Sequence, residues 1–396
     1  MDNNKRKKIA LAIEHFNKYK GGAESYAVSL AATLADKGWE VHFFGQSWDG
    51  EPHSAVFHEI KIPKLLPSWV KMLMFAIKHK QMVMKQNFDV VLGFGNTIYM
   101  NVYQSHGGVH RYSTDRKVYS ERNIILRFVK RLLIFFSIKD KVRNWIESAP
   151  FRLNPRPEII AISQMVREDM ASYFRNDEKD INLIYNGIDT AKYNKNLRNS
   201  FRGTVRQQLS INDDDIAFIF SSYTLKKKGI EPLIETTAQL KKENIDNFKI
   251  IVLGAQPYPS LLRKIARLDL KDTVIFLGPI KAPEKYYAAC DALIMPTYYD
   301  TCSLVVIEAM ACGLPTITTV CCGAAGIITT GKDGYIISHP PVPEDLLKVM
   351  TALLSRERLK KMSIEAALKA SKYSTKENHR EMIKVFDEVA EKKSPT

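Results

Sequence analysis

The 396 residues, of which 45% are hydrophobic and 26% charged, have the composition of a globular chain with room for two domains. We expect neither a membrane-spanning helix nor a signal peptide, because no apolar run approaches the ~20 residues that cross a bilayer. A formal net charge of +15 indicates anionic partners, and five cysteines without metal-ligand spacing favour free thiols in a reducing cytoplasm over a metal site.

The first half of the chain has the pattern of a parallel sheet covered by helices. Its strands are continuous apolar runs such as KIALAIE and FDVVLGF, and the segments between them are long enough for helices. Strands that are buried on both faces of a sheet produce this pattern. We therefore expect a Rossmann-like domain over residues 1–190. Its predicted strands are residues 8–14, 41–46, 88–94, 158–162 and 182–186.

Two adjacent glycines follow the first of these strands. Gly21 and Gly22 precede a predicted helix that ends at Gly38. Glycines at a strand-to-helix turn allow a ligand to approach the backbone closely. The dinucleotide fingerprint G-x-G-x-x-G is absent, and a simple turn is the alternative interpretation.

Over half of the net positive charge lies in residues 111–157, which hold twelve Lys and Arg residues but four Asp and Glu residues. Between Ile124 and Phe136 the cations alternate with large apolar side chains, which is typical of an interfacial helix attracted to anionic lipid. Nucleic-acid binding is disfavoured, because the aromatic residues stand among aliphatic ones. A buried helix pair with a solvated rim is the alternative. We expect this segment to dock the first domain on a membrane.

The second half repeats the pattern of strands and helices after a polar stretch, residues 194–215. We expect a second Rossmann-like domain over residues 191–373, so that the fold class is α/β with two parallel sheets. Residues 374–396 predict a charged helix that packs back on the first domain. The predicted strands of the second domain are residues 216–221, 248–254, 273–278, 292–296, 315–319 and 334–338.

A run of three lysines follows the first strand of the second domain. Lys226, Lys227 and Lys228 precede Gly229 at a strand-to-helix turn, where the ligands of such folds gather. Cations at this place suit a diphosphate, although a lysine run is also typical of a solvated loop.

Two acidic residues surround the start of another predicted helix. Asp300 follows the strand 292–296, the helix opens near Ser303, and Glu308 lies one to two turns into it. On a single helix the two acids would be about 12 Å apart, too far to share a proton. Placing Asp300 in a loop instead leaves the first helical amides open to a phosphate.

Five motifs together resemble the retaining glycosyltransferases of family 4. The resemblance implies the GT-B fold, in which two Rossmann-like domains have parallel sheets facing a central cleft. The motif at 300–319 resembles the family's E-x7-E block and is the most specific of the five, although Asp300 stands where the family usually has Glu. Two further stretches, FGQSWDG and VYQSHGGVHR, are similar to the subgroup that adds glucose to heptose in the lipopolysaccharide core. The five motifs are GGAE at 21–24, AISQMV at 161–166, YNGID at 185–189, KKKG at 226–229 and DTCSLVVIEAMACGLPTITT at 300–319.

The resemblance implies a nucleotide-sugar site and two catalytic candidates. Glu308 would bind the ribose hydroxyls, and Asp300 would lie beside the transferred sugar. His106 stands where many family members have an active-site histidine, but a structural role for it is equally open. The diphosphate would be held by lysines, backbone amides and glycines, namely Lys227, Lys228, Ser303, Leu304, Val305, Gly21 and Gly22.

The resemblance also implies a reaction and a cellular place. We expect a metal-independent, retaining hexosyltransferase without a cofactor that moves glucose from UDP-glucose to a lipid-anchored glycan such as the lipopolysaccharide core. It would be cytoplasmic and peripheral on the anionic inner leaflet of the cytoplasmic membrane. A non-catalytic membrane-binding protein on the same scaffold and a nucleotide-sugar epimerase are the alternatives.

Overall fold

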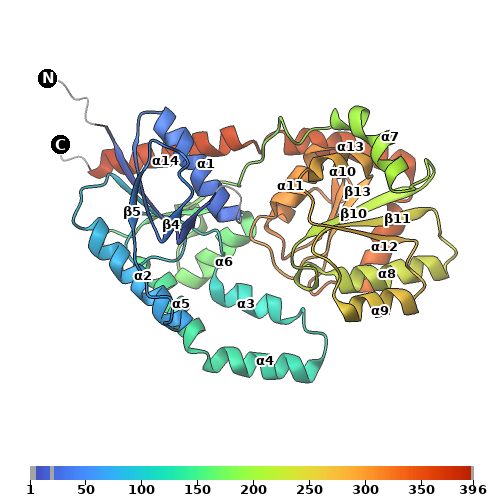
Figure 1. The fold of residues 1–396 in the computed structure, drawn as a ribbon, viewed down its shortest axis with the longest axis horizontal. Helices are drawn as coiled ribbons and strands as arrows, with labels where there is room; N and C mark the ends of the chain where they lie inside the picture. Colours follow the sequence, from blue (N-terminus) through green and yellow to red (C-terminus); the bar gives the residue numbers. More distant parts are fainter. Residues whose placement is uncertain (1–5, 18–21, 394–396) are drawn as a thin grey trace. The chain divides into compact units, whose positions relative to one another are not determined.

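The computed structural model describes residues 6–17 and 22–393, which group into two compact units (Figure 1). Unit 1 contains the described residues up to 115, residues 123–185 and those from 378 onward, and unit 2 contains residues 116–122 and 186–377. The sequence analysis placed residues 116–122 in the first domain, whereas the structure groups them with unit 2. An ion pair between Arg122 and Glu235 lies within this group.

Unit 1 is built on a parallel sheet with the strand order β5-β3-β1-β6-β7-β8-β9. The central strand β1 pairs with β3 and β6, so that Leu11 lies between Phe43 and Leu92. The strand bounds are β1 Lys8–Ala12, β3 Glu40–Gly45, β5 Val56–Glu59, β6 Val90–Gly93, β7 Val102–Gln104, β8 Glu158–Ala161 and β9 Ile181–Leu183. The two-residue strands β2 His15–Phe16 and β4 Ser47–Trp48 pair separately.

Helices cover both faces of this sheet. Neighbouring side chains of a strand point to opposite faces, and Phe43 and Phe44 show the two environments. Phe43 stacks on Phe16 at 3.9 Å in the core beneath α1, whereas Phe44 packs edge-on against His79 of α2. The helices of unit 1 are α1 Gly22–Asp36, α2 Ser68–Val83, the greater part of α3 His110–Val118, α4 Ile124–Phe136, α5 Ile138–Ser148, α6 Gln164–Phe174 and the greater part of α14 Thr375–Lys393.

The last helix, α14, contributes to the core of unit 1. Its residues Met382, Val385, Phe386 and Val389 recur at helical spacing and are buried in the same cluster as the apolar stripe of α1. Phe386 is fully buried and packs edge-on against Trp39, with ring centroids 6.4 Å apart. The C-terminal segment is thus a structural part of the first unit.

Unit 2 is a second parallel sheet, with the order β12-β11-β10-β13-β14-β15. Its strands are β10 Ile216–Ser222, β11 Phe248–Gly254, β12 Val274–Gly278, β13 Ala292–Met295, β14 Thr316–Thr319 and β15 Gly334–Ile337. Its helices are α7 Leu197–Gln208, α8 Ile230–Lys242, α9 Pro259–Arg267, α10 Pro283–Ala289, α11 Leu304–Ala311, α12 Pro343–Ala352 and α13 Arg356–Ala370. Because β10 and β13 are adjacent and parallel, the loops that follow them meet at one edge of the sheet.

Phe386→Ala should destabilise unit 1, because it removes a fully buried side chain and leaves a cavity in the core. We expect the free energy of unfolding to fall by about 3–5 kcal/mol, measured by chemical denaturation. Phe135→Ala is the matched control, since Phe135 is 69% exposed and its truncation should cost within about 0.5 kcal/mol. Equal stability of the two variants would contradict the placement of α14 in the core.

Candidate functional site

The loop after β13 presents a partly buried ion pair, in which each side chain is 19% exposed. Asp300 accepts hydrogen bonds from the backbone amides of Ser303 at 2.9 Å and Cys302 at 3.3 Å, and it pairs with the ammonium group of Lys228. Burial raises the pKa of Asp300, but the charge of Lys228 and the hydrogen bonds outweigh it, so that the pKa lies below its usual value. Asp300 therefore remains a carboxylate at neutral pH.

The partner lysine comes from the loop after β10. Lys226–Lys228 form one turn of 3-10 helix that ends at Gly229, which has a left-handed φ of 85°. A Cβ on Gly229 would lie 2.1 Å from the carbonyl oxygen of Pro296, so that only glycine allows the two loops to approach this closely. Lys227 is exposed, and its carbonyl accepts a 3.0 Å hydrogen bond from the amide of Tyr298.

Helix α11 begins beside this ion pair. Ser303 caps it in the left-handed region with φ 36° and ψ 76°, a conformation that costs a non-glycine residue strain. Its amide is turned towards Asp300. Of the three amides predicted to hold a diphosphate, those of Leu304 and Val305 lie in the first turn of the helix, where no intrahelical acceptor exists. The positive end of the helix thus lies next to the ion pair.

Glu308 lies one turn further into α11, in a partly buried position. Burial raises its pKa to about 7, although the charge of Lys192 and a hydrogen bond with Tyr193 favour the ionised form. Burial and the negative charge of Glu308 raise the pKa of Tyr193. Sequence reasoning missed Lys192 and Tyr193, although they lie only three and four residues after the motif YNGID at 185–189.

Unit 1 contains the other catalytic candidate. His106 follows β7, and its ring lies 4.8 Å from that of Tyr26 and 5.2 Å from that of Phe94. Burial lowers the pKa of His106 to about 3, so that the imidazole is neutral at physiological pH. Gly22 begins α1 and is exposed, with open space around the position of a Cβ. The other predicted glycine, Gly21, lies outside the described residues.

His106 lines a cavity of about 670 Å³ within unit 1. The cavity also contains side chains of both charges, which sequence reasoning did not connect because they come from distant segments. The charged members are Glu14, Glu24, Lys71, Lys139 and Arg143. Such a mixture of hydrogen-bonding groups suits a polyhydroxylated ligand.

The structure therefore brings the predicted residues together in two groups, one in each unit. Lys227, Lys228, Asp300, the start of α11 and Glu308 belong to unit 2, whereas His106 and Gly22 belong to unit 1. Within residues 6–17 and 22–393, no three His, Cys, Asp or Glu side chains cluster as they would around a metal ion.

Comparisons with known proteins cover both units. The model described as "Glycosyltransferase Family 4" matches residues 20–192, and that described as "Glycosyl transferases group 1" matches residues 201–370. The lipopolysaccharide glucosyltransferase WaaG of Escherichia coli (strain K12) is 24% identical over 343 residues, which are 86% of this chain and 88% of that protein.

Solved structures share the architecture. The crystal structure of WaaG superposes with a TM-score of 0.77 at 19% identity, covering 96% of this chain and 99% of that one. Anabaena Alr3699/HepE in complex with UDP-glucose gives a TM-score of 0.68 at 18% identity, with coverages of 96% and 99%. The predicted fold class, two Rossmann-like domains with parallel sheets in the GT-B arrangement, is confirmed. The chain belongs to the family 4 glycosyltransferases.

Proposed function

We propose that this glycosyltransferase transfers glucose from UDP-glucose, with retention at the anomeric carbon, to a lipid-anchored glycan such as the lipopolysaccharide core. The observation that carries the proposal is the cluster in unit 2, where Asp300, Lys228 and the positive end of α11 converge at the carboxyl ends of β10 and β13. The relatives WaaG, a lipopolysaccharide glucosyltransferase, and HepE, solved with UDP-glucose, support this choice of donor and acceptor.

The diphosphate of the donor would lie against the start of α11. Lys227 and Lys228 supply positive charge there, and the amides of Leu304 and Val305 supply hydrogen-bond donors. When the bond to the sugar breaks, negative charge accumulates on the departing diphosphate. Fixed donors stabilise this charge without having to reorganise, and in this way the site would accelerate the reaction independently of a metal.

Asp300 would position the transferred sugar while it holds Lys228. We infer attack from the front face: the acceptor hydroxyl oxygen bonds to the anomeric carbon on the side from which the UDP oxygen departs. The proton of the acceptor hydroxyl passes to the departing phosphate oxygen, which supplies the base. Retention follows, because both bonds lie on the same face of the sugar.

Glu308 would bind the ribose. Its ionised carboxylate can accept a hydrogen bond from each of the two ribose hydroxyls, and Tyr193 beside it fixes the orientation. Because the pKa of Glu308 is about 7, the form that binds ribose best is only half populated at neutral pH in the free protein. Binding of the donor would favour loss of the proton from the remaining protonated Glu308.

In unit 1, the cavity beside His106 would receive the acceptor. A neutral imidazole with a pKa of about 3 is a weak base, so that His106 would orient a hydroxyl by hydrogen bonding rather than remove its proton. This role keeps His106 in the site but assigns the proton transfer to the departing phosphate.

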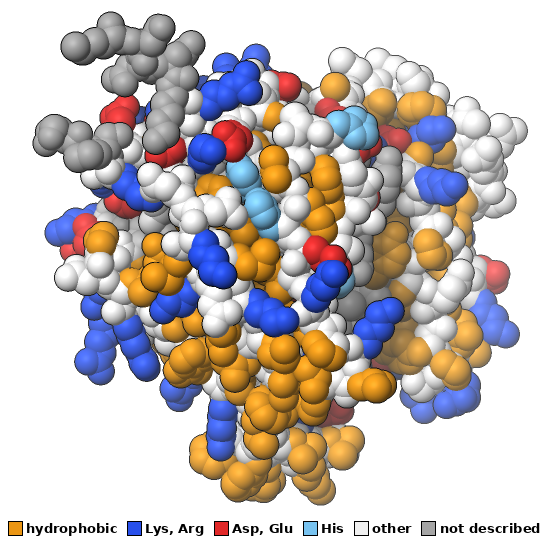
Figure 2. Space-filling model, turned by 60° about the vertical axis from the view of Figure 1, so that its left-hand side comes forward, with side chains coloured by type: hydrophobic (Ala, Val, Ile, Leu, Met, Phe, Trp, Pro, Cys, Tyr) orange, Lys and Arg blue, Asp and Glu red, His pale blue; other side chains and the backbone are white. Residues whose placement is uncertain are grey.

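Helix α4 would anchor the protein to an anionic bilayer. No residue of the helix is buried, and its outer surface carries Phe128, Leu133, Phe135 and Phe136, each more than 60% exposed. Hydrophobic side chains gather at the bottom of Figure 2, the level at which Figure 1 places α4. Arg127, Lys130 and Arg131 interrupt these residues, and α4 contains no acidic residue. Among the described residues, no helix could cross a membrane.

The donor and the reaction are tested by a panel of nucleotide sugars, scored for release of UDP or GDP with and without a heptose-containing lipid acceptor. We expect UDP release from UDP-glucose that depends on the acceptor. Asp300→Asn should reduce turnover by about a hundredfold, while Asp214→Asn, a change at an exposed position, should not. Isomerised donor in the absence of acceptor would instead favour an epimerase.

The pH dependence of UDP binding tests Glu308. Because burial raises its pKa to about 7, the ionised fraction should rise about tenfold between pH 6 and 8, and UDP affinity should rise with it. Glu308→Gln should bind UDP weakly, and only the titration of the nucleotide phosphate should remain in its pH profile. Identical pH profiles of calorimetric affinity for the two proteins would exclude Glu308 from ribose binding.

Sedimentation with liposomes tests the membrane surface. Lys130→Gln with Arg131→Gln should weaken partitioning onto anionic vesicles by about 2 kcal/mol, roughly thirtyfold, with little effect on neutral vesicles. Lys241→Gln with Lys242→Gln removes the same charge from α8 and is the control. The proposal fails if the wild-type protein does not bind anionic vesicles, or if both double variants bind them equally.

A further inference from the structure

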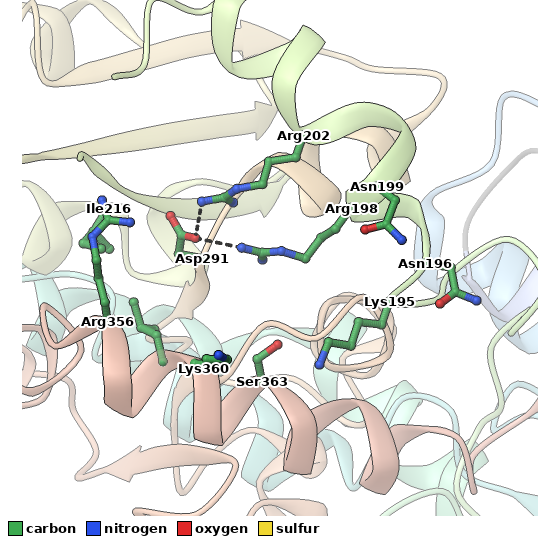
Figure 3. Close-up of a pocket in the computed structure, with 11 residues that line it drawn as sticks. Lys195, Asn196, Arg198, Asn199, Arg202, Ile216, Asp291, Arg356, Lys360 and Ser363 are labelled. Atoms are coloured by element: carbon green, nitrogen blue, oxygen red, sulfur yellow. Dashed lines mark hydrogen bonds and ion pairs between the residues drawn. The ribbon is translucent and has the colours of Figure 1, made fainter. Parts of the chain in front are cut away.

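A second cavity lies in unit 2, at the opposite edge of its sheet from the proposed donor site. Its volume is about 500 Å³, and it opens between α7, α13 and the beginnings of β10 and β13 (Figure 3). Asp291, which lines it, directly precedes β13, whereas Asp300 follows β13. The four residues of β13, at about 3.3 Å each, separate the two edges by about 13 Å. The cavity is therefore separate from the residues assigned to UDP-glucose.

One wall of this cavity is formed by Asp291 with Arg198, Arg202 and Arg206, a cluster that is called the Asp291 brace below. The buried carboxylate of Asp291 accepts hydrogen bonds from Arg202 at 2.8 Å, Arg198 at 3.1 Å and Arg206 at 3.3 Å. Arg198 and Arg202 also donate to carbonyl oxygens at the end of α10, which fixes α7 to that helix. Packing explains these arginines, but one carboxylate cannot neutralise three guanidinium groups. Burial and the neighbouring Arg202 accordingly lower the pKa of Arg198.

The opposite wall adds three further cations. Figure 3 shows Lys360 on α13 and Lys195 before α7 beside the same hollow that holds Arg198 and Arg202. Arg356 joins them from the first turn of α13. Its guanidinium group donates to the carbonyl oxygen of Asp213 at 2.5 Å and lies 3.7 Å from the carboxylate of the exposed Asp214. Asp291 is the single acidic residue among those described as lining the cavity.

Such an arrangement is unfavourable unless something negative enters it. Five cationic side chains facing a shared hollow repel one another, and one buried carboxylate compensates only part of their charge. Guanidinium groups are planar forks that match the oxygens of a phosphate, and Ser363 and Asn199 add neutral hydrogen-bonding groups at the rim. The volume is sufficient for a ligand of several linked groups.

We propose that this cavity is a second anion site, which binds a small molecule carrying two or more phosphate groups. Lys195, Lys360 and Arg356 contact the phosphates, while Arg198 and Arg202 supply the positive potential from the brace. Ligand in this site bridges α7 and α13 and so stabilises unit 2 against unfolding. Inorganic pyrophosphate and the phosphates of a nucleotide share the chemistry that the site recognises.

Calorimetric titration with inorganic pyrophosphate tests the proposal. The double substitution Lys195→Gln with Lys360→Gln removes two cations, of which Lys195 is half-buried and Lys360 is exposed. It leaves the Asp291 brace intact, so that the protein should fold normally. We expect this double variant to lose about tenfold or more in affinity. Lys361→Gln is the matched control, because Lys361 lies on the same helix but pairs with Glu357 outside the cavity. It should bind pyrophosphate as the wild type does.

Lys228→Gln separates this site from the donor site, which can also attract a diphosphate. The proposal requires that pyrophosphate binding survives Lys228→Gln and weakens in the Lys195/Lys360 variant. Loss confined to Lys228→Gln, equal affinity of all variants, or no binding to the wild type would overturn it. ATP affinity should show the same dependence on Lys195 and Lys360. Equal ATP affinity of the wild type and the double variant would also contradict a phosphate site.

Discussion

The ion pair between Asp300 and Lys228 is the interaction on which the proposed chemistry of unit 2 depends. It joins the loops after two neighbouring strands and turns the amide of Ser303 towards the carboxylate. A lone charge of either sign would be unfavourable in this partly buried position, whereas each partner compensates the other. The result is a carboxylate and an ammonium group held ready beside the first turn of α11, where charge would develop during sugar transfer.

The fold supplies the constraint that makes this pair possible. Parallel pairing of β10 with β13 places both loops at one edge, and Gly229 permits their close approach because any Cβ there would collide with Pro296. The second cationic cavity arises from the same sheet at its other edge, where α7 is fixed to the end of α10 by arginines around Asp291. Unit 2 thus offers positive charge at both ends of its strands, and the proposed donor site lies at only one of them.

Sequence patterns were sufficient for the fold class and for the long buried strands, because continuous apolar runs have few alternatives in a parallel sheet. The strand β7 was missed, since Val102–Gln104 is three residues long and ends in a buried glutamine. The edge strand β5, Val56–Glu59, was missed because it is half exposed and has no apolar run. Both strands are defined by their neighbours rather than by their own composition.

The sequence predicted residues of the candidate site only where they lie within a family motif. Lys228 and Asp300 are 72 residues apart, and their direct pairing follows from sheet topology that no local pattern contains. The same is true of Tyr193 beside Glu308, and of Lys195 and Lys360 around the second cavity. Long-range juxtaposition of charged side chains needs the fold, and it is there that the structure adds most to the sequence.

The most direct measurement is UDP affinity across the Asp300 and Lys228 pair, by calorimetry on the wild type, Asp300→Asn, Lys228→Gln and the double variant. If the pair forms the diphosphate site, Lys228→Gln weakens UDP binding, and the two substitutions are coupled by about 1 kcal/mol or more. Unchanged UDP affinity in Lys228→Gln, with effects that simply add in the double variant, would contradict the account.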